Sequence, residues 1–141
     1  MDALQISRSG LDVEWRRLEI IADNLANANT TRTAMGGAYR AMRLVSGPRA
    51  GFAAQLQGAT DARSLAGVAV YDIAAADLPV RKVHEPGHPH ADEDGYVSYP
   101  GIDHAGEMTL MVKTARVYEA NLVAMNIARQ MYAKALELGR R

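Results

Sequence analysis

Residues that break helices are confined to the middle of this chain. All five prolines and nine of the twelve glycines lie between residues 36 and 101. The stretches on either side carry apolar residues at helical spacing. This distribution predicts two long terminal helices, one over residues 2–27 and one that starts near residue 105 after an N-cap at Asp103 and stops at Gly139.

The apolar residues of the two predicted helices form stripes. In the first helix, leucines recur every seven residues. The last helix carries two stripes, which is more than a single antiparallel partner can cover, so the second stripe predicts an assembly interface. The leucines are Leu4, Leu11, Leu18 and Leu25; the first stripe of the last helix is Met111, Ala115, Tyr118, Leu122, Met125, Tyr132 and Leu136; the second is Leu110, Val117, Ala124, Met131 and Leu138.

Polar residues on these helices allow more than one interpretation. Asn121 and Asn126 lie within an otherwise striped helix, where they either face solvent or form hydrogen bonds across an interface and fix its register. Arg17 is expected at the surface, where its removal would cost less than about 0.5 kcal/mol. We expect the assembly interface to comprise Leu4, Leu11, Trp15, Leu18, Asn24, Leu25, Asn27, Met111, Tyr118, Asn121, Leu122, Met125, Tyr132 and Leu136.

The central insert has the composition of short strands joined by turns. β-Branched and aromatic residues concentrate at 39–45, 68–73, 80–83 and 96–99, whereas residues 46–66 show no periodicity and predict a loop. The expected fold is therefore α+β and mainly α, with the terminal helices paired as an antiparallel coiled coil. Residues 1–30 and 105–141 would form a rod domain, and residues 31–104 a small β-rich insert.

Composition argues against several classes of function. Formal net charge is zero, which favours neither nucleic acid nor direct insertion into a membrane, and the chain has no cysteine. No apolar run is long enough to span a bilayer, and the N-terminal residues lack the pattern of a cleavable signal peptide. No catalytic motif or phosphate-binding glycine loop is present. We expect no enzymatic activity and no cofactor.

Four histidines, His84, His88, His90 and His104, form the one cluster with the chemistry of a metal site. Acidic residues at 85 and 92–94 accompany them, and such a set could ligate Zn²⁺ or Ca²⁺. The acidic run is too short for a twelve-residue calcium loop, and the adjacent prolines and glycines are typical of a turn. We expect a polar turn and no metal, although a metal-dependent enzyme remains an alternative.

Three groups of residues resemble a known family. The N-terminal group is Gly10, Arg17-Leu18, Asn24-Leu25-Ala26-Asn27-Ala28 and Tyr39-Arg40; the C-terminal group is Glu107-Met108, Ala115-Arg116, Tyr118, Ala120-Asn121, Asn126, Leu136, Leu138 and Gly139. These groups resemble the terminal signatures of bacterial flagellar rod and hook proteins. The third group lies within residues 85–103 and is similar to the corresponding segment of the short proximal-rod subunits of that family.

The resemblance implies a structural subunit of the flagellar basal body, located in the periplasmic rod. Such a subunit would be exported by the flagellar type III apparatus without a cleaved signal, and would polymerise helically through its terminal helices to transmit torque. Its implied partners are copies of itself, other proximal-rod subunits, the distal-rod protein, and basal-body ring and export-gate proteins. The alternative of another class is a cytosolic coiled-coil adaptor or export chaperone.

Overall fold

The computed structural model describes residues 3–49 and 67–139 and has an α+β fold. Along the sequence, a long helix comes first and another comes last, with four short strands between them. The elements are α1 (Ala3–Ala26), β1 (Met42–Pro48), β2 (Val68–Ala75), β3 (Arg81–His84), β4 (Tyr96–Tyr99) and α3 (His104–Leu138).

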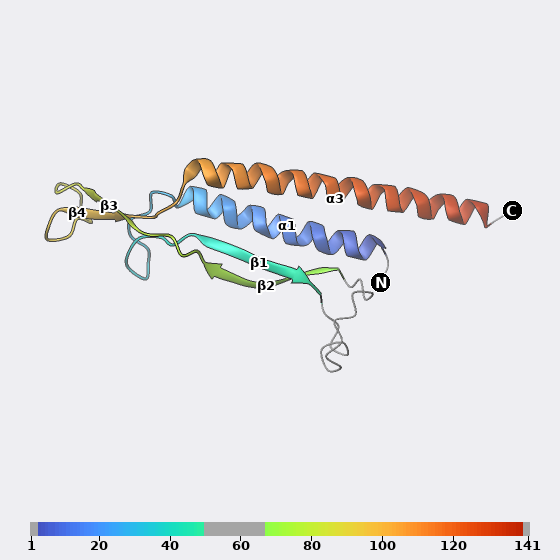
Figure 1. Ribbon diagram of the computed structural model, residues 1–141, viewed down its shortest axis with the longest axis horizontal. Helices are drawn as coiled ribbons and strands as arrows, with labels where there is room; N and C mark the ends of the chain where they lie inside the picture. The colour runs from blue at the N-terminus through green and yellow to red at the C-terminus, as the bar shows by residue number, and fades with distance from the viewer. Residues whose placement is uncertain (1–2, 50–66, 140–141) are drawn as a thin grey trace, which may run out of the picture.

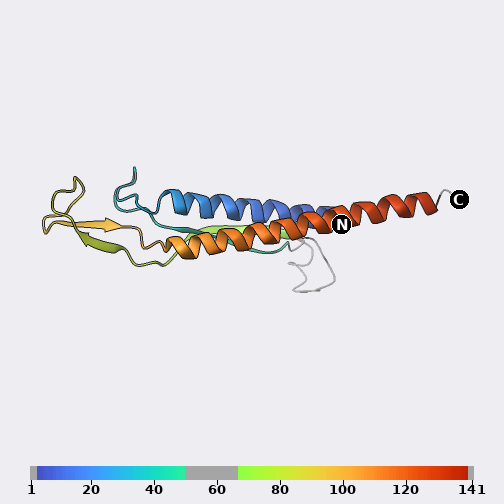
Figure 2. The ribbon, with the colours of Figure 1, turned by 90° about the horizontal axis from the view of Figure 1, so that it is seen from above.

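The molecule is elongated, with its long axis along the two helices (Figures 1 and 2). α1 and α3 lie side by side and run in opposite directions, and the β1–β2 hairpin lies along α1 on the side away from α3 (Figure 1). The β3–β4 hairpin projects beyond the end where α1 finishes and α3 begins. At the other end, α3 continues past the start of α1. α1 is therefore the middle layer, between α3 and a strand hairpin.

The helices end where short-range signals predict. At the end of α1 the carbonyl of Asp23 accepts twice from Asn27, from its amide at 3.0 Å and from its Nδ2 at 2.9 Å. Asp103 is the N-cap of α3, because its Oδ1 accepts from the amide of Ala105 at 3.1 Å. Gly139 is the C-cap, and its amide donates to the carbonyl of Ala135 at 3.1 Å. Both predicted caps of the last helix are confirmed.

Both hairpins are antiparallel two-stranded sheets. β2, β3 and β4 match the predicted strands closely, whereas β1 starts and ends three residues later than expected. Residues 46–48 therefore continue the strand and do not open a loop, and a register shift between Val45 and Ser46 accommodates them. The rest of the predicted loop, residues 50–66, lies outside the described residues.

The buried apolar cluster lies between α1 and the first hairpin. Val13 and Ile20 of α1 contact Leu44 of β1, and Met42, Val68 and Ile73 pack against them at the margin. Val13 and Ile20 lie seven residues apart and form a second apolar stripe on α1, beside the leucines. Because α1 has two apolar faces, it can bury one against the strands and turn the other toward α3. None of the helices in residues 3–49 and 67–139 is both long and apolar enough to cross a membrane.

Candidate assembly surface

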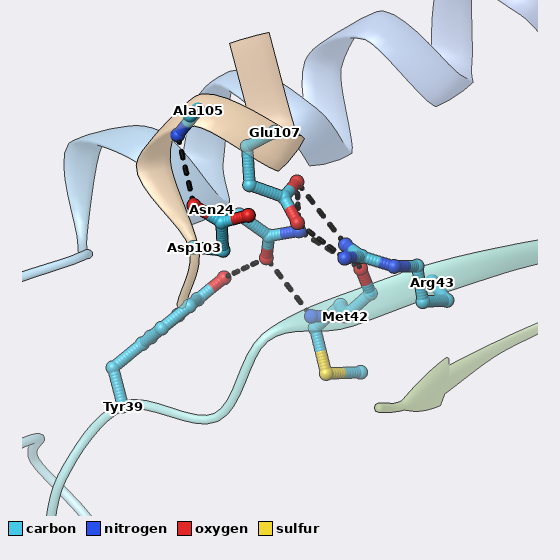
Figure 3. Close-up of polar contacts among 7 residues, drawn as sticks. All are labelled: Asn24, Tyr39, Met42, Arg43, Asp103, Ala105 and Glu107. Carbon is cyan, nitrogen blue, oxygen red and sulfur yellow. Dashed lines mark hydrogen bonds and ion pairs between the residues drawn. The ribbon is translucent and has the colours of Figure 1, made fainter. Parts of the chain in front are cut away.

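A buried polar junction ties α1, β1 and α3 together, and Asn24 is its centre (Figure 3). Asn24 is fully buried, with 0% of its surface exposed. Its Nδ2 donates to the carbonyl of Met42 at 3.0 Å and to Oε2 of Glu107 at 3.3 Å. Its Oδ1 accepts from the amide of Met42 at 2.9 Å and from the hydroxyl of Tyr39 at 3.1 Å. One side chain thus pairs both backbone groups of the residue that begins β1 and links them to both helices.

Glu107 is the second member of the junction and is 2% exposed. The guanidinium of Arg43 forms an ion pair with both of its carboxylate oxygens, with Nη1 3.1 Å from Oε2 (Figure 3). A buried carboxylate is tolerated only when its charge is paired and its oxygens accept hydrogen bonds. Here Arg43 supplies the charge and Asn24 a further donor, so the first turn of α3 is attached to β1 as well as to α1.

Tyr39, in the loop between α1 and β1, is the last member of the junction. Partial burial raises the pKa of its phenol, and the carboxylates of Asp23 and Glu107 raise it further. Because the folded pKa lies above the unfolded value, the contribution of this group to stability is fully present below about pH 10. It is lost as the pH rises through the folded pKa. The junction is therefore expected to keep its hydrogen bonds throughout the neutral range.

Arg17 makes a second polar link between α1 and β1, contrary to its expected surface position. Its Nη2 lies 2.9 Å from Oγ of Ser46, its Nη1 lies 3.5 Å from the carbonyl of Leu44, and its Nε lies 3.1 Å from Oε2 of Glu14. The side chain is 32% exposed. The sequence gives no sign of this link because its partner, β1, lies almost thirty residues away in the chain.

We predict that Arg17→Ala lowers the free energy of unfolding by about 1–2 kcal/mol, because a charged donor loses its acceptors on the strand. Arg16→Ala is the matched control. Arg16 pairs only with Glu19 in the described structure, both side chains are largely exposed, and such a pair contributes less than about 0.5 kcal/mol. Urea denaturation followed by circular dichroism measures both values. Equal losses for the two variants would contradict a structural role for Arg17.

The two helices approach closely where a glycine of α1 meets an amide of α3. A Cβ added to Gly10 would lie 3.1 Å from Nδ2 of Asn121, so the missing side chain makes room for that asparagine. Closer to the middle of α1, the rings of Trp15 and Tyr118 pack with centroids 6.1 Å apart. Together with the Asn24 to Glu107 bond, these contacts align residues 10–24 of α1 antiparallel to residues 107–121 of α3.

The structure divides the sequence-predicted interface residues into two groups. One group is buried or half-buried within the chain itself, and the other is exposed on its surface. The first group is Leu4, Leu11, Leu18, Asn24, Leu25, Asn27, Met111, Tyr118, Asn121 and Met125; the second is Trp15, Leu122, Tyr132 and Leu136.

The second stripe of α3 remains on the surface over its whole length. Its five members, from Leu110 to Leu138, are all exposed. A shallow hollow of about 420 Å³ lies on the early part of α3 and is lined by Met108, Thr109, Val112 and Lys113. Exposed apolar residues that recur at this regular spacing along a helix of 35 residues form a stripe, unlike the single apolar residues scattered over an ordinary protein surface. It is the part of the described structure best suited to contact another protein.

His84, His88 and His90 lie in the β3–β4 hairpin, and His104 is the first residue of α3. The hydrogen bonds of His88 and His90 hold the loop between β3 and β4. Nδ1 of His88 accepts from the amide of His90 at 3.0 Å, and Nδ1 of His90 lies 2.8 Å from Oγ1 of Thr31. Tyr99 donates to Glu85 at 3.0 Å; this hydrogen bond is the main reason that the pKa of Tyr99 is raised. No three histidine or acidic side chains in the described part of the chain are arranged to hold a metal ion.

Two family models match the ends of the chain. Residues 4–38 match the model described as flagella basal body rod protein, and residues 93–138 match the C-terminal model of the flagellar basal body rod FlgEFG proteins. The matched segments contain all of α1 except its first residue and the whole of α3, together with the partners Asn24 and Glu107 of the buried junction.

Curated relatives extend the likeness to nearly the whole chain. The flagellar basal-body rod protein FlgC of Escherichia coli O6:H1 is 35% identical over 99% of this chain and 97% of its own length. The FlgC proteins of Salmonella typhimurium and Bacillus subtilis are each 34% identical, over 99% and 98% of this chain and 97% of their own lengths. These relatives do not favour the adaptor or chaperone alternative. The chain therefore belongs to the FlgC family of flagellar basal-body rod proteins and is a structural subunit of the rod, not an enzyme.

Proposed function

We propose that this subunit belongs to the proximal part of the rod and polymerises helically through its terminal helices to transmit torque. The observation that carries the proposal is the exposed second stripe of α3. α1 is covered on one side by β1–β2 and on another by α3, whereas the stripe from Leu110 to Leu138 is available to neighbours. Close-packed apolar contacts between neighbours resist shear because protein interiors compress very little.

The pairing of the two helices has the spacing of an antiparallel coiled coil. Seven residues on the α1-facing side of α3 are buried or half-buried and alternate in steps of four and three. We infer knobs-into-holes packing along this seam, and a rod domain of residues 1–30 and 105–141 that carries residues 31–104 as its insert. The seven are Glu107, Met111, Thr114, Tyr118, Asn121, Met125 and Ala128.

Membership of the FlgC family leads us to propose partners and an export route for this subunit. We place the subunit in the periplasmic rod beside copies of itself, other proximal-rod subunits and the distal-rod protein, in reach of the basal-body ring and export-gate proteins. We propose that the flagellar type III apparatus exports it without cleavage of a signal peptide. The polar junction would then keep the helices and β1 in one fixed arrangement once the chain has folded in the rod.

Leu18→Asp tests whether the α1 to α3 seam is required for assembly. Leu18 is half-buried on the leucine side of α1, and an unpaired carboxylate there costs several kcal/mol unless water reaches it. We predict that a strain lacking the native gene and supplied with this variant makes the protein but completes no rod and does not swim. Soft-agar motility, immunoblotting and electron microscopy of basal bodies provide the readouts.

Gln5→Asp is the control, because it introduces the same carboxylate at an exposed position of the same helix. This strain is expected to swim. A motile Leu18→Asp strain with normal basal bodies would show that the seam between α1 and α3 is not needed for rod assembly.

A further inference from the structure

The end of the molecule formed by the β3–β4 hairpin is acidic. The loop between its strands, residues 85–95, includes Glu85, Asp92, Glu93 and Asp94 and no lysine or arginine, whereas Arg81 and Lys82 are exposed at the start of β3, away from this loop. Three of these four acidic residues are exposed, Glu85 being the exception. The hairpin end also exposes an aromatic ring, since Tyr96 is 43% exposed. Its tip therefore combines negative charge with apolar surface.

The opposite end is basic. We call residues 128–138 of α3 the α3 overhang, because this part of the helix runs past the start of α1 (Figure 1). Arg129 and Lys134 are exposed there, against the single acid Glu137, and two further arginines follow in the sequence. Met131 and Leu138 are also exposed, at 67% and 74%. Like the hairpin tip, this end presents charge together with apolar side chains, but the sign of the charge is reversed.

The two charged ends cannot meet within one chain. They lie at opposite extremities of an elongated molecule, separated by the helix pair (Figures 1 and 2). Contact between two hairpin ends, or between two overhangs, would place like charges together, which disfavours symmetric dimers joined end to end. Contact between an overhang and a hairpin end brings opposite charges together and leaves one end of each kind free. Repeated from copy to copy, such head-to-tail contacts generate open helical assemblies, unless the rotation between copies closes them into a ring.

We propose that the α3 overhang docks against the β3–β4 hairpin of a second copy of this chain, with basic side chains facing acidic ones. The proposal rests on the proposed function and names one contact by which the exposed part of α3 would be covered. The apolar residues of the overhang, Met131 and Leu138, lose water in this contact, while Arg129 and Lys134 select the acidic end and orient the approach.

The test is sedimentation equilibrium of the full chain at up to about 1 mM, in low salt and in about 0.5 M salt, where charges are screened beyond a few ångströms. We expect weak association in low salt that decreases in high salt. The variant R129E/K134E reverses the overhang, and E93K/D94K reverses the hairpin tip; each is expected to lower the association constant at least tenfold. Asp92 is kept, because its Oδ1 accepts from the amides of Asp94 and Tyr96 and shapes the turn.

The chain that carries all four substitutions is the decisive variant. It restores opposite charges at the two ends, so its association is expected to return to within about threefold of the native chain, with circular dichroism verifying the fold of every variant. The proposal is overturned by a native chain that does not associate, by reversals without effect, or by a four-substitution chain that fails to recover. Incorporation of the native chain into basal bodies is a separate measurement, and it would still support the proposed function in each of those cases.

Discussion

Asn24→Ala is expected to lower the free energy of unfolding by about 3 kcal/mol, because the groups that bond to Asn24 are left in a buried site without their partner. These groups are the amide and carbonyl of Met42, the hydroxyl of Tyr39 and the carboxylate of Glu107. No other side chain of the described junction can replace all four contacts. Urea denaturation of the purified chain gives the value.

Asn126→Ala is the matched control for this variant. Asn126 is also an asparagine within a long helix, but it is exposed. Its replacement is expected to change stability by less than about 0.5 kcal/mol. A loss below about 1 kcal/mol for Asn24→Ala would show that water replaces the missing contacts, and that the junction does not hold β1 to the helices.

Glu107→Ala is expected to cost a similar amount, about 2–3 kcal/mol. Breaking a buried ion pair commonly costs more than this, but Arg43 is 38% exposed and its charge can reach water once the carboxylate is gone. The same variant removes an acceptor from Asn24 and a favourable negative charge from the first turn of α3. Denaturation midpoints measured at equal protein concentration provide the comparison.

Two further variants separate the ion pair from the rest of the network. Glu119→Ala removes an acid from an exposed pair with Arg116 and should cost less than about 0.5 kcal/mol. Combining Glu107→Ala with Arg43→Ala should cost less than the sum of the two single losses, because the second substitution removes a charge that no longer has its partner. Strict additivity would mean that the two side chains do not interact in solution.

The elements of the fold were predictable because their signals are local. The spacing of apolar residues, the N-cap Asp103, the asparagines after α1 and the β-branched segments each depend on a few neighbouring residues. The antiparallel arrangement of α1 and α3 also agrees with the prediction. Boundaries were less accurate: β1 is displaced by three residues, because its limits depend on pairing with β2 and on its contacts with α1.

The buried junction was not predictable as a unit, although Asn24 was expected at an interface. Glu107 was singled out as part of the C-terminal group that resembles the flagellar family, and Arg17 was expected at the surface. Both meet partners that are distant in the sequence: Glu107 is 64 residues from Arg43 and 83 from Asn24. The sequence did contain one signal that Glu107 is buried. Glu107, Met111, Thr114 and Tyr118 follow one another in steps of four, three and four, which is the spacing of a coiled-coil seam.

The second apolar stripe of α1 was also missed. The leucines dominate the pattern, and Val13 and Ile20 are spaced like them but displaced around the helix, toward β1 and β2. A helix with two apolar faces was recognised at the C-terminal end of the chain but not at the N-terminal end. Recognising it there would have placed the first hairpin against α1.

Subunit-resolved cryo-electron microscopy of purified basal bodies would show directly which surface of this subunit its neighbours cover. We expect this chain in the proximal rod, with α1 and α3 paired as described, Asn24 and Glu107 in contact, and the stripe from Leu110 to Leu138 buried against neighbouring subunits. A subunit whose Leu110 to Leu138 stripe still faces solvent in the assembled rod, with its neighbours contacting other surfaces, would contradict this expectation.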